Sequence, residues 1–434
     1  MAAARPASRS QCASLDRRRR AGGEESRVVP EGTEPHVWAP PARSRCADKQ
    51  IKHRQHTMSM TRPILYVGLD VHADSISIAT ADASRDGEVR HYGTIPATLR
   101  ALDSVLTKLG HPGTELRVCY EAGPTGFVIA RHLTKKGIAC LVAAPSLIPS
   151  PKGNKIKTDC RDSIKLTRLH RAGELTAVHV PDATDESIRD ICRARTDAVD
   201  DKRRAMCQLK AFLLRHGHGI ADKTPWSEAL MRTLRSIALQ LPAMNIVLEE
   251  YIQAIDTAHQ RIARLEHQME NVLATWEQAP VVRALMGLRG IRLVSAMILV
   301  SELGDIHRFA HPRLLMAYLG LVPSEASSGG KRRVGGLTKT GNAHVRWLIN
   351  ESAQHYRLPP KVSPDLSKRQ EGIAREHRAE VQKISWKCQQ RLYDKGRQMA
   401  GRLKIRQKVQ IALARELCGF VWAIMKAVQP VTAR

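Results

Sequence analysis

Alternating apolar and polar residues predict β-strands from Ile64 onward. The segment ILYVGLD (64–70) is an apolar run that ends in a carboxylate, SISIATADA (75–83) alternates, and EVRHYGTI (88–95) follows a turn at Asp86-Gly87. Short runs of this kind, separated by turn residues, are typical of consecutive strands in hairpin order. We therefore expect three such strands at the start of the ordered chain.

Helical and strand patterns then alternate as far as Ala172. Three helices and two further strands are predicted at 101–109, 115–121, 125–136, 138–144 and 159–172. The resulting order, β-β-β-α-β-α-β-α, predicts a mixed sheet with helices packed on it, which is an α/β fold.

From about 184 to 280 the pattern is almost wholly helical. Leu248, Ile255, Ile262 and Met269 recur every seven residues, which is typical of a coiled coil of about three heptads. This stripe fits a seam between two subunits, and it also fits a core helix packed within one chain. We favour the seam, and therefore a dimer.

The C-terminal part of the chain is predicted to be mainly helical. Residues 281–356 are a compact unit punctuated by glycines, and an amphipathic helix is expected near 411–427. Between them, residues 361–408 carry 14 Lys+Arg against 5 Asp+Glu. This basic stretch favours a nucleic-acid-binding face over a merely solvated helix face.

The charge balance of the whole chain points to a polyanionic partner. Lys+Arg number 69 against 42 Asp+Glu, a net charge of +27, which most simply indicates nucleic acid. Aromatic residues make up only 4%, too few for a surface that reads single strands mainly by base stacking. No apolar run reaches the ~20 residues of a membrane span and no signal-peptide core is present. We therefore expect a cytoplasmic protein without a membrane partner.

The cysteine content bears on whether the chain holds disulfides or a zinc site. The nine cysteines include no Cys-x-x-Cys pair, so reduced thiols are expected rather than disulfides or a zinc site.

Residues 1–57 lack apolar periodicity and hold 12 Lys+Arg against 6 Asp+Glu. They are interpreted as a basic nucleic-acid arm or, preferably, as a disordered tail ahead of a start at Met58 or Met60.

Four carboxylates fall at places where they would meet. Asp70 ends the first predicted strand and Glu121 the fourth, while Asp159 and Asp162 stand three residues apart at the start of a helix. If the fourth strand pairs with the first, all four would gather at one edge of the sheet. Each acid alone reads equally as a strand end or a helix cap. Together they predict a site for Mg²⁺, which prefers oxygen ligands.

Glycine and serine dominate the chemistry of the unit 281–356. Gly287 and Gly290 lie between two helical patterns, and this resembles a helix-hairpin-helix turn as well as an ordinary helical turn. Further on, Ser327 and Ser328 precede two glycines. The residues predicted to bind nucleic acid around them are Lys331, Arg332, Arg333, Lys339, Asn342 and Arg346. A hydroxyl among cations suits attack on a phosphodiester, although a loop that only binds the DNA backbone fits too.

These motifs in combination resemble the DEDD-type transposases of the "one-ten" insertion-sequence family. The resemblance covers roughly 64–356, and its pieces are VGLDVHADSI (67–76), YEAGPTGF (120–127), KTDCRDS (157–163), GLRGI (287–291), AYLGLVPSEASSGGKRR (317–333) and TKTGNAHVRWLI (338–349). It implies a ribonuclease-H-like sheet similar to Holliday-junction resolvases, a helical coiled-coil linker and a mainly helical C-terminal transposase domain. Cys160 departs from the motif, where a basic residue is common.

The resemblance also implies roles for individual residues. Asp70, Glu121, Asp159 and Asp162 match the family's metal-binding catalytic acids, with Mg²⁺ as cofactor. Ser328 matches the nucleophilic serine, with Ser327 as the neighbouring alternative. The implied partners are DNA at the element ends and target, a guide RNA from the element, and further subunits in a homodimer that assembles into a tetramer. The implied location is the bacterial cytoplasm, at the nucleoid when the protein is bound to DNA.

The predicted domains follow from these patterns. They are a basic extension (1–60), a DEDD domain (61–180), a helical linker (181–280), a transposase unit with the glycine turn and Ser-Gly loop (281–356) and a basic helical part (357–434).

Three functions stay open at this point. The preferred one is a transposase or site-specific recombinase that cleaves and exchanges DNA strands. A metal-dependent, structure-selective endonuclease would need only the acids and would use Ser328 as a DNA contact. A non-catalytic nucleic-acid-binding protein would bind with steep salt dependence and never cut.

Overall fold

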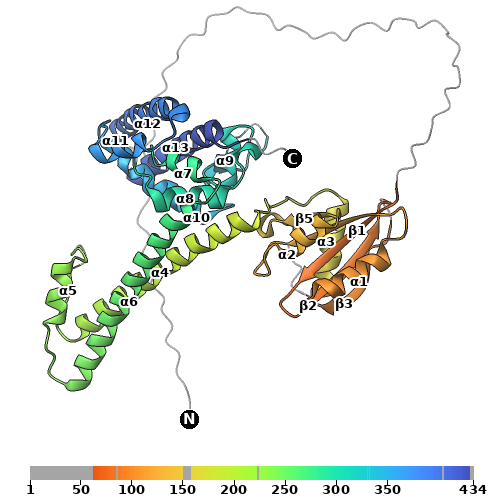
Figure 1. The fold of residues 1–434 in the computed structure, drawn as a ribbon, viewed down its shortest axis with the longest axis horizontal. Coiled ribbons are helices and arrows are strands. Elements are labelled where there is room, and N and C mark those ends of the chain that lie inside the picture. Colours follow the sequence, from red (N-terminus) through yellow and green to blue (C-terminus); the bar gives the residue numbers. More distant parts are fainter. Residues whose placement is uncertain are drawn as a thin grey trace, which may run out of the picture. The chain divides into compact units, whose positions relative to one another are not determined.

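The computed structural model describes residues 62–84, 87–149, 158–221, 224–329, 331, 333–402 and 405–430 (Figure 1). The predicted basic extension and Arg332 lie outside these described residues.

A five-stranded mixed sheet opens the described chain. Its strands are β1 (Ile64–Val71), β2 (Ser75–Asp82), β3 (Arg90–Pro96), β4 (Glu115–Glu121) and β5 (Ala139–Ala143). They lie side by side in the order β3-β2-β1-β4-β5. β1 pairs antiparallel with β2 and parallel with β4, and β4 pairs parallel with β5. The predicted mixed sheet is confirmed.

Helices cover both faces of this sheet. Side chains alternate across a strand, so Leu69 and Tyr120 face one core, which they share with α1 (Leu99–Leu109) and α2 (Val128–Lys135). The opposite face packs on α3 (Asp159–Arg171). Gly68 allows this close approach, because a Cβ there would lie 2.7 Å from the carbonyl oxygen of Ser163 in α3. A short helix, η1 (Pro145–Leu147), follows β5.

A long helical hairpin follows the sheet. It consists of α4 (Ala183–Arg215), α5 (Glu228–Arg235) and α6 (Pro242–Leu273). Ion pairs join Arg195 to Glu266 at 2.6 Å and Asp201 to Arg261 at 3.2 Å. From the first ion pair to the second, the residue number increases on α4 and decreases on α6, so the two helices run antiparallel.

The heptad stripe of α6 is buried inside this hairpin. Ile255 is 3% exposed and Met269 is fully buried within the single chain, where α6 packs on α4. The favoured interpretation of the stripe as a seam between subunits is therefore wrong, and the alternative of a core helix packed within one chain is correct. A seven-residue repeat reports only that a helix has an apolar face, which either neighbour can cover.

The remaining chain forms a mainly helical unit, as predicted. Its elements are α7 (Ala279–Leu285), α8 (Leu293–Leu303), η2 (Ile306–Arg308), α9 (Pro312–Tyr318), β6 (Pro323–Glu325), β7 (Val334–Leu337), α10 (Ala343–Ala353), η3 (Gln354–Arg357), α11 (Pro364–Glu371), α12 (Arg375–Gly401) and α13 (Arg406–Val428). α13 lies at its centre, packed against α7, α9, α10 and α12. Leu413, Leu417 and Val421 of α13 are fully buried.

Two expectations from the sequence concern the cysteines and membrane-spanning helices. The cysteines in the described ranges are free thiols, and burial raises the pKa of Cys119, Cys388 and Cys418, which disfavours the reactive thiolate. None of the described helices is both long enough and apolar enough to cross a membrane.

Candidate functional site

The register of β1 and β4 brings two predicted acids next to each other. Leu69 pairs with Tyr120, and both face the core under α1 and α2. The following residues, Asp70 and Glu121, therefore face the opposite side, toward α3. Neighbouring strands lie about 4.8 Å apart, so the two carboxylates start from adjacent positions.

Hydrogen bonds place the first turn of α3 over this edge. Thr158 caps the helix by accepting from the backbone N–H of Arg161. The hydroxyls of Ser77 and Ser163 lie 3.2 Å apart, and Thr167 donates to the carbonyl of Ala79 at 3.2 Å. Since Asp70 pairs with Ser77 in the sheet, the start of α3 is held directly above Asp70. Carboxylates in a first helical turn are also favoured by the helix dipole.

His72 completes a group of three side chains that the structure brings together. Its Nε2 lies 3.2 Å from Oδ2 of Asp70 and 3.5 Å from Oδ1 of Asp159. One potential ligand atom from each residue lies within 4.8 Å of the other two. Sequence reasoning missed His72, although a strand-end Asp followed two residues later by His is a usable signal, because both side chains leave the same face of the strand.

The charged form of Asp70 is disfavoured in this group. Burial raises the pKa of Asp70, and the negative charges of Asp162 and Asp159 raise it further, while His72 acts in the opposite direction. Asp70 is 16% exposed and Asp159 is 59% exposed, so one oxygen-bearing side chain is sheltered and the other open to solvent. Two carboxylates and an imidazole on an accessible sheet edge fit the donor set of a divalent metal ion.

The four predicted acids are not equivalent. Asp70 and Asp159 belong to the three-residue group, and Asp162 is partly buried one turn further along α3, where its charge acts on Asp70. Glu121 is exposed beside Asp70 and outside the three-residue group.

The predicted serines lie in a hairpin between β6 and β7. Ser328 and Lys331 pair through their backbones at 3.1 Å and 3.3 Å, and Gly329 between them has a φ of +58° that favours glycine. Ser327 donates its hydroxyl to Glu325 Oε1 at 2.7 Å and accepts from the backbone N–H of Arg333. The hydroxyl of Ser328 is exposed and has no hydrogen-bond partner among the described residues.

The predicted nucleic-acid contacts divide into two kinds. Lys331, Arg333 and Lys339 are exposed around the hairpin. Arg346 instead donates to the carbonyls of Leu319 at 2.9 Å and Thr340 at 2.8 Å, which ties the loop before α10 to the end of α9.

Asn342 has a structural contact of its own. Its Oδ1 caps α10 by accepting from the backbone N–H of Val345 at 3.0 Å, and its Nδ2 donates to Glu302 Oε2 at 2.8 Å. Asn342 and Arg346 therefore hold the loop that carries Lys339.

Glu302 is a polar centre that sequence reasoning missed. It sits in the apolar helix α8 with its side chain 3% exposed, and Arg193 binds it through two hydrogen bonds of 2.8 Å and 3.1 Å. Burial raises its pKa, but His344, Arg193 and Arg189 together outweigh this and lower the pKa to about 2. Nothing in the sequence around Glu302 signals these partners, since they come from α4 and α10.

The two glycines of the α7–α8 turn are explained by packing. A Cβ on Gly287 would lie 3.0 Å from Ile373, and Gly290 has a φ of +79°. The carbonyl of Gly287 accepts from Ser385 at 2.7 Å and from Gln370 at 3.1 Å. These contacts account for the turn as an ordinary helix–helix connection, and its binding of a DNA phosphate stays a prediction.

Comparisons with known proteins cover both halves of this arrangement. A DEDD-type transposase model matches residues 67–217, which contain the four acids, and the model described as "Transposase IS116/IS110/IS902 family" matches residues 282–362, which contain Ser328. A putative transposase of Sinorhizobium fredii, y4qE, is 40% identical over 372 residues, covering 85% of this chain and 90% of the relative. The transposase of insertion sequence element IS1533 from Leptospira borgpetersenii is 26% identical over 311 residues, covering 71% and 90%. The chain therefore belongs to the IS116/IS110/IS902 family of DEDD transposases.

Proposed function

We propose that this chain catalyses DNA strand cleavage and exchange for the transposition of an insertion sequence, with Ser328 as the nucleophile. The observation that carries the proposal is the junction of β1 and α3, where Asp70, His72 and Asp159 converge on a space of metal-ion size in a DEDD transposase. The acids assigned to the metal are Asp70, Glu121, Asp159 and Asp162.

The topology supports a ribonuclease-H-like sheet of the kind found in Holliday-junction resolvases. Three antiparallel strands are followed by two parallel ones in the order β3-β2-β1-β4-β5, with the acids at the end of the central strand β1 and its neighbour β4. On this basis we propose domains at 61–180, 181–280, 281–356 and 357–434.

The acids would hold Mg²⁺ against the DNA backbone. Asp70 and Asp159 offer the oxygen ligands that Mg²⁺ prefers, and their partial exposure leaves room for water and a phosphate oxygen. Bound Mg²⁺ would supply charge stabilisation at the phosphodiester under attack. His72 would orient the two carboxylates.

Ser328 suits the nucleophile better than Ser327. Its hydroxyl is exposed, whereas that of Ser327 is engaged by Glu325. In the proposed step a bond forms between Ser328 Oγ and phosphorus as one phosphorus–oxygen bond of the strand breaks. The serine proton leaves to a base, and the departing sugar oxygen takes up a proton. Lys331, Arg332, Arg333 and Lys339 would hold the phosphate, while Asn342 and Arg346 position their loop.

The proposed assembly follows the family resemblance. The chain would act in the cytoplasm on the element ends and the target DNA as a homodimer that pairs into a tetramer, guided by an RNA from the element. The net charge of +27 supports a complex with nucleic acid.

A metal-dependent endonuclease is the second candidate. One observation favours it: Asp70, His72 and Asp159 come from the end of β1, the residue that follows it and the start of α3, and no residue of the serine hairpin in the described chain belongs to this group. Water would then attack the phosphodiester, and Ser328 would only contact DNA.

A denaturing gel separates the two. Purified protein is incubated with Mg²⁺, labelled element-junction DNA and RNA transcribed from the non-coding flank of the element, using wild type, Ser328→Ala, Ser327→Ala and Asp70→Ala. A protease-sensitive protein–DNA adduct that persists in Ser327→Ala and is lost in Ser328→Ala and Asp70→Ala supports the serine mechanism. Free nicked DNA that survives Ser328→Ala supports the endonuclease. Binding with neither product supports a non-catalytic protein.

A further inference from the structure

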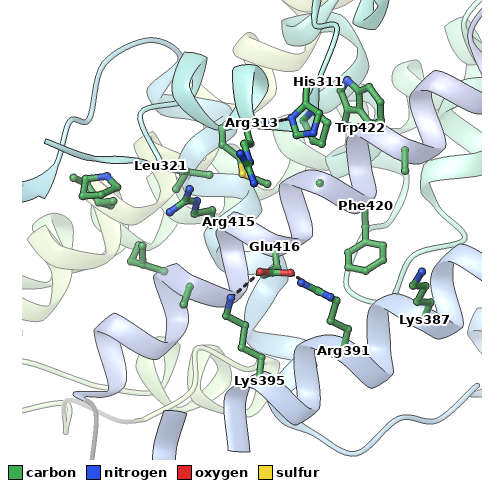
Figure 2. A pocket seen from close by; sticks show the side chains of 18 of the residues that line it. His311, Arg313, Leu321, Lys387, Arg391, Lys395, Arg415, Glu416, Phe420 and Trp422 are labelled. Carbon is green, nitrogen blue, oxygen red and sulfur yellow. Dashed lines mark hydrogen bonds and ion pairs between the residues drawn. The ribbon is translucent and has the colours of Figure 1, made fainter. Parts of the chain in front are cut away.

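A large pocket lies between α9, α12 and α13, and neither the four acids nor Ser328 lines it. It has a volume of about 760 Å³, and Figure 2 shows its side chains. Pro323 and Leu337, at the base of the serine hairpin, form part of its lining. α12 and α13 lie outside the residues matched by either transposase model, which end at residue 362.

The pocket is strongly cationic. Its lining includes Arg313, Lys387, Arg391, Lys395, Lys408 and Arg415, and the only carboxylate that lines it is Glu416. Glu416 lies between Arg391 at 2.6 Å and Lys395 at 2.7 Å, which joins α13 to α12 (Figure 2). The other four cations have no carboxylate partner in the described part of the chain.

These cations are not merely a solvated helix face. Lys387, Arg391 and Lys395 are spaced four residues apart on α12 and so share one side of that helix. Lys408 and Arg415 of α13 and Arg313 of α9 line the same pocket. Cations converging from three helices repel one another, and a chain of phosphates would relieve this repulsion.

One wall of the pocket is apolar and aromatic. Phe420 and Trp422 of α13 line the pocket (Figure 2), and Met316 of α9 also belongs to its lining. The indole N–H of Trp422 is engaged by the carbonyl of Phe309 at 2.9 Å, so Trp422 is fixed in the protein. The ring of Phe420 is only partly buried and has no such tie. A face of one aromatic ring beside cations suits one unpaired base.

We infer that this pocket binds a single-stranded segment of nucleic acid, with its phosphates on Lys387, Arg313, Lys408 and Arg415 and one unpaired base against Phe420. A duplex with all bases paired offers phosphates but no free base. Because the chain has few aromatic residues, we expect a single stacked base in this pocket and not a run of stacked bases. Because the hairpin base forms part of the wall, a strand held here would run toward Ser328. The site requires neither metal nor serine chemistry, so it stands or falls independently of the proposed function.

Binding measured without cleavage tests the inference. The full-length protein is titrated, in EDTA, into a labelled single strand of about 16 nucleotides, as DNA and as RNA of the same sequence, and into the matching duplex. The pocket variant is Lys387→Glu with Arg415→Glu. The matched control is Arg375→Glu with Lys383→Glu, which reverses two exposed charges of α12 that do not line the pocket. Phe420→Leu removes the ring, and Phe420→Tyr keeps it.

The pocket variant should weaken single-strand binding at least about tenfold and reduce the slope of log affinity against log salt by about 1.4, the value for two lost phosphate contacts. The control should change affinity less than about threefold. Phe420→Leu should weaken single-strand binding about five- to 140-fold and leave duplex binding unchanged, whereas Phe420→Tyr should bind as wild type.

The oligonucleotide that loses affinity in the pocket variant identifies the bound strand as DNA, RNA or both. Each of these results supports the site. Equal losses in the pocket variant and the control would overturn it. So would a Phe420→Leu protein, folded by circular dichroism, that binds single strands as wild type or loses duplex binding equally.

Discussion

At the scale of single residues, the buried carboxylate of Glu302 joins three helices. It accepts from Arg193 of α4 and from Asn342 at the start of α10, and it sits on α8 itself. Asn342 in turn caps the helix that follows the Lys339 loop. One charge buried in an apolar helix thus sets the position of the loop that follows β7, the second strand of the hairpin that carries Ser328. Removing one partner of such a buried pair leaves other charges without compensation.

Glu302→Gln should destabilise the chain in a pH-dependent way. The folded pKa of about 2 lies below the ordinary value of 4.5, so ionised Glu302 stabilises the fold above pH 4.5 and loses this contribution as the pH falls toward 2. The shift corresponds to about 3 kcal/mol in the free energy of unfolding. Urea unfolding followed by tryptophan fluorescence should therefore show a large difference between wild type and variant at pH 7. That difference should shrink below pH 4.5. A difference of the same size at every pH would contradict this role.

At the scale of elements, the contact between β1 and α3 decides where the acids stand. Gly68 has no side chain at the point where α3 crosses the strand, and a Cβ would lie 2.7 Å from two backbone atoms of α3, the Ser163 oxygen and the Thr167 nitrogen. Backbone atoms of a helix cannot rotate away as a side chain can. The helix would have to shift, and Asp159 and Asp162 would shift with it.

Gly68→Ala should therefore reduce stability by about 1–3 kcal/mol and weaken metal binding together. Thermal unfolding with and without Mg²⁺ measures both, because a metal that binds only the folded state raises the unfolding temperature. Gly123→Ala is the control, since the nearest atom to its added Cβ would be 3.9 Å away. An unchanged Mg²⁺ response in Gly68→Ala would show that the acids do not depend on this packing.

The pairing of α4 with α6 leads to a second prediction at this scale. Ile255 is 3% exposed inside the hairpin of one chain, so Ile255→Ala should cost about 2–4 kcal/mol of stability. The loss in unfolding temperature should be the same in dilute and concentrated protein, because the contact is intramolecular. If dilution alone lowered the stability of wild type as strongly as the substitution does, the stripe would be a subunit interface after all.

A structural feature can be predicted from the sequence when residues close together in the chain determine it. The apolar run at 64–70 and the strand pattern at 115–121 predict both strands, and if these strands pair, Asp70 and Glu121 are predicted to be neighbours. The heptad stripe does not distinguish a subunit seam from a helix packed within one chain, because the partner of an apolar face is not encoded in that face. The buried pairing of Glu302 with Arg193, and of Ser327 with Glu325, depends on tertiary packing and hairpin geometry. Local patterns do not carry that information.

At the scale of the whole molecule, the two halves of the proposed chemistry belong to separate parts of the chain. The acids lie on β1, β4 and α3, and Ser328 lies in the β6–β7 hairpin, with the α4–α6 hairpin between them in sequence. The family resemblance implies that one subunit supplies acids to the serine of another. In that arrangement a chain that lacks the acids can still supply the serine, and a chain that lacks the serine can still supply the acids.

Mixing inactive variants tests this division. Asp70→Ala and Ser328→Ala should each form no protein–DNA adduct alone, whereas a mixture unfolded and refolded together should recover adduct formation. In a random mixture of dimers half contain one chain of each kind. Each such dimer pairs the intact acids of one chain with the intact serine of the other, so about a quarter of the wild-type sites are restored. A double variant mixed with wild type is the control for dilution. If acids and serine instead served each other within one chain, every mixed dimer would lack a complete site, and the mixture would stay inactive at any ratio.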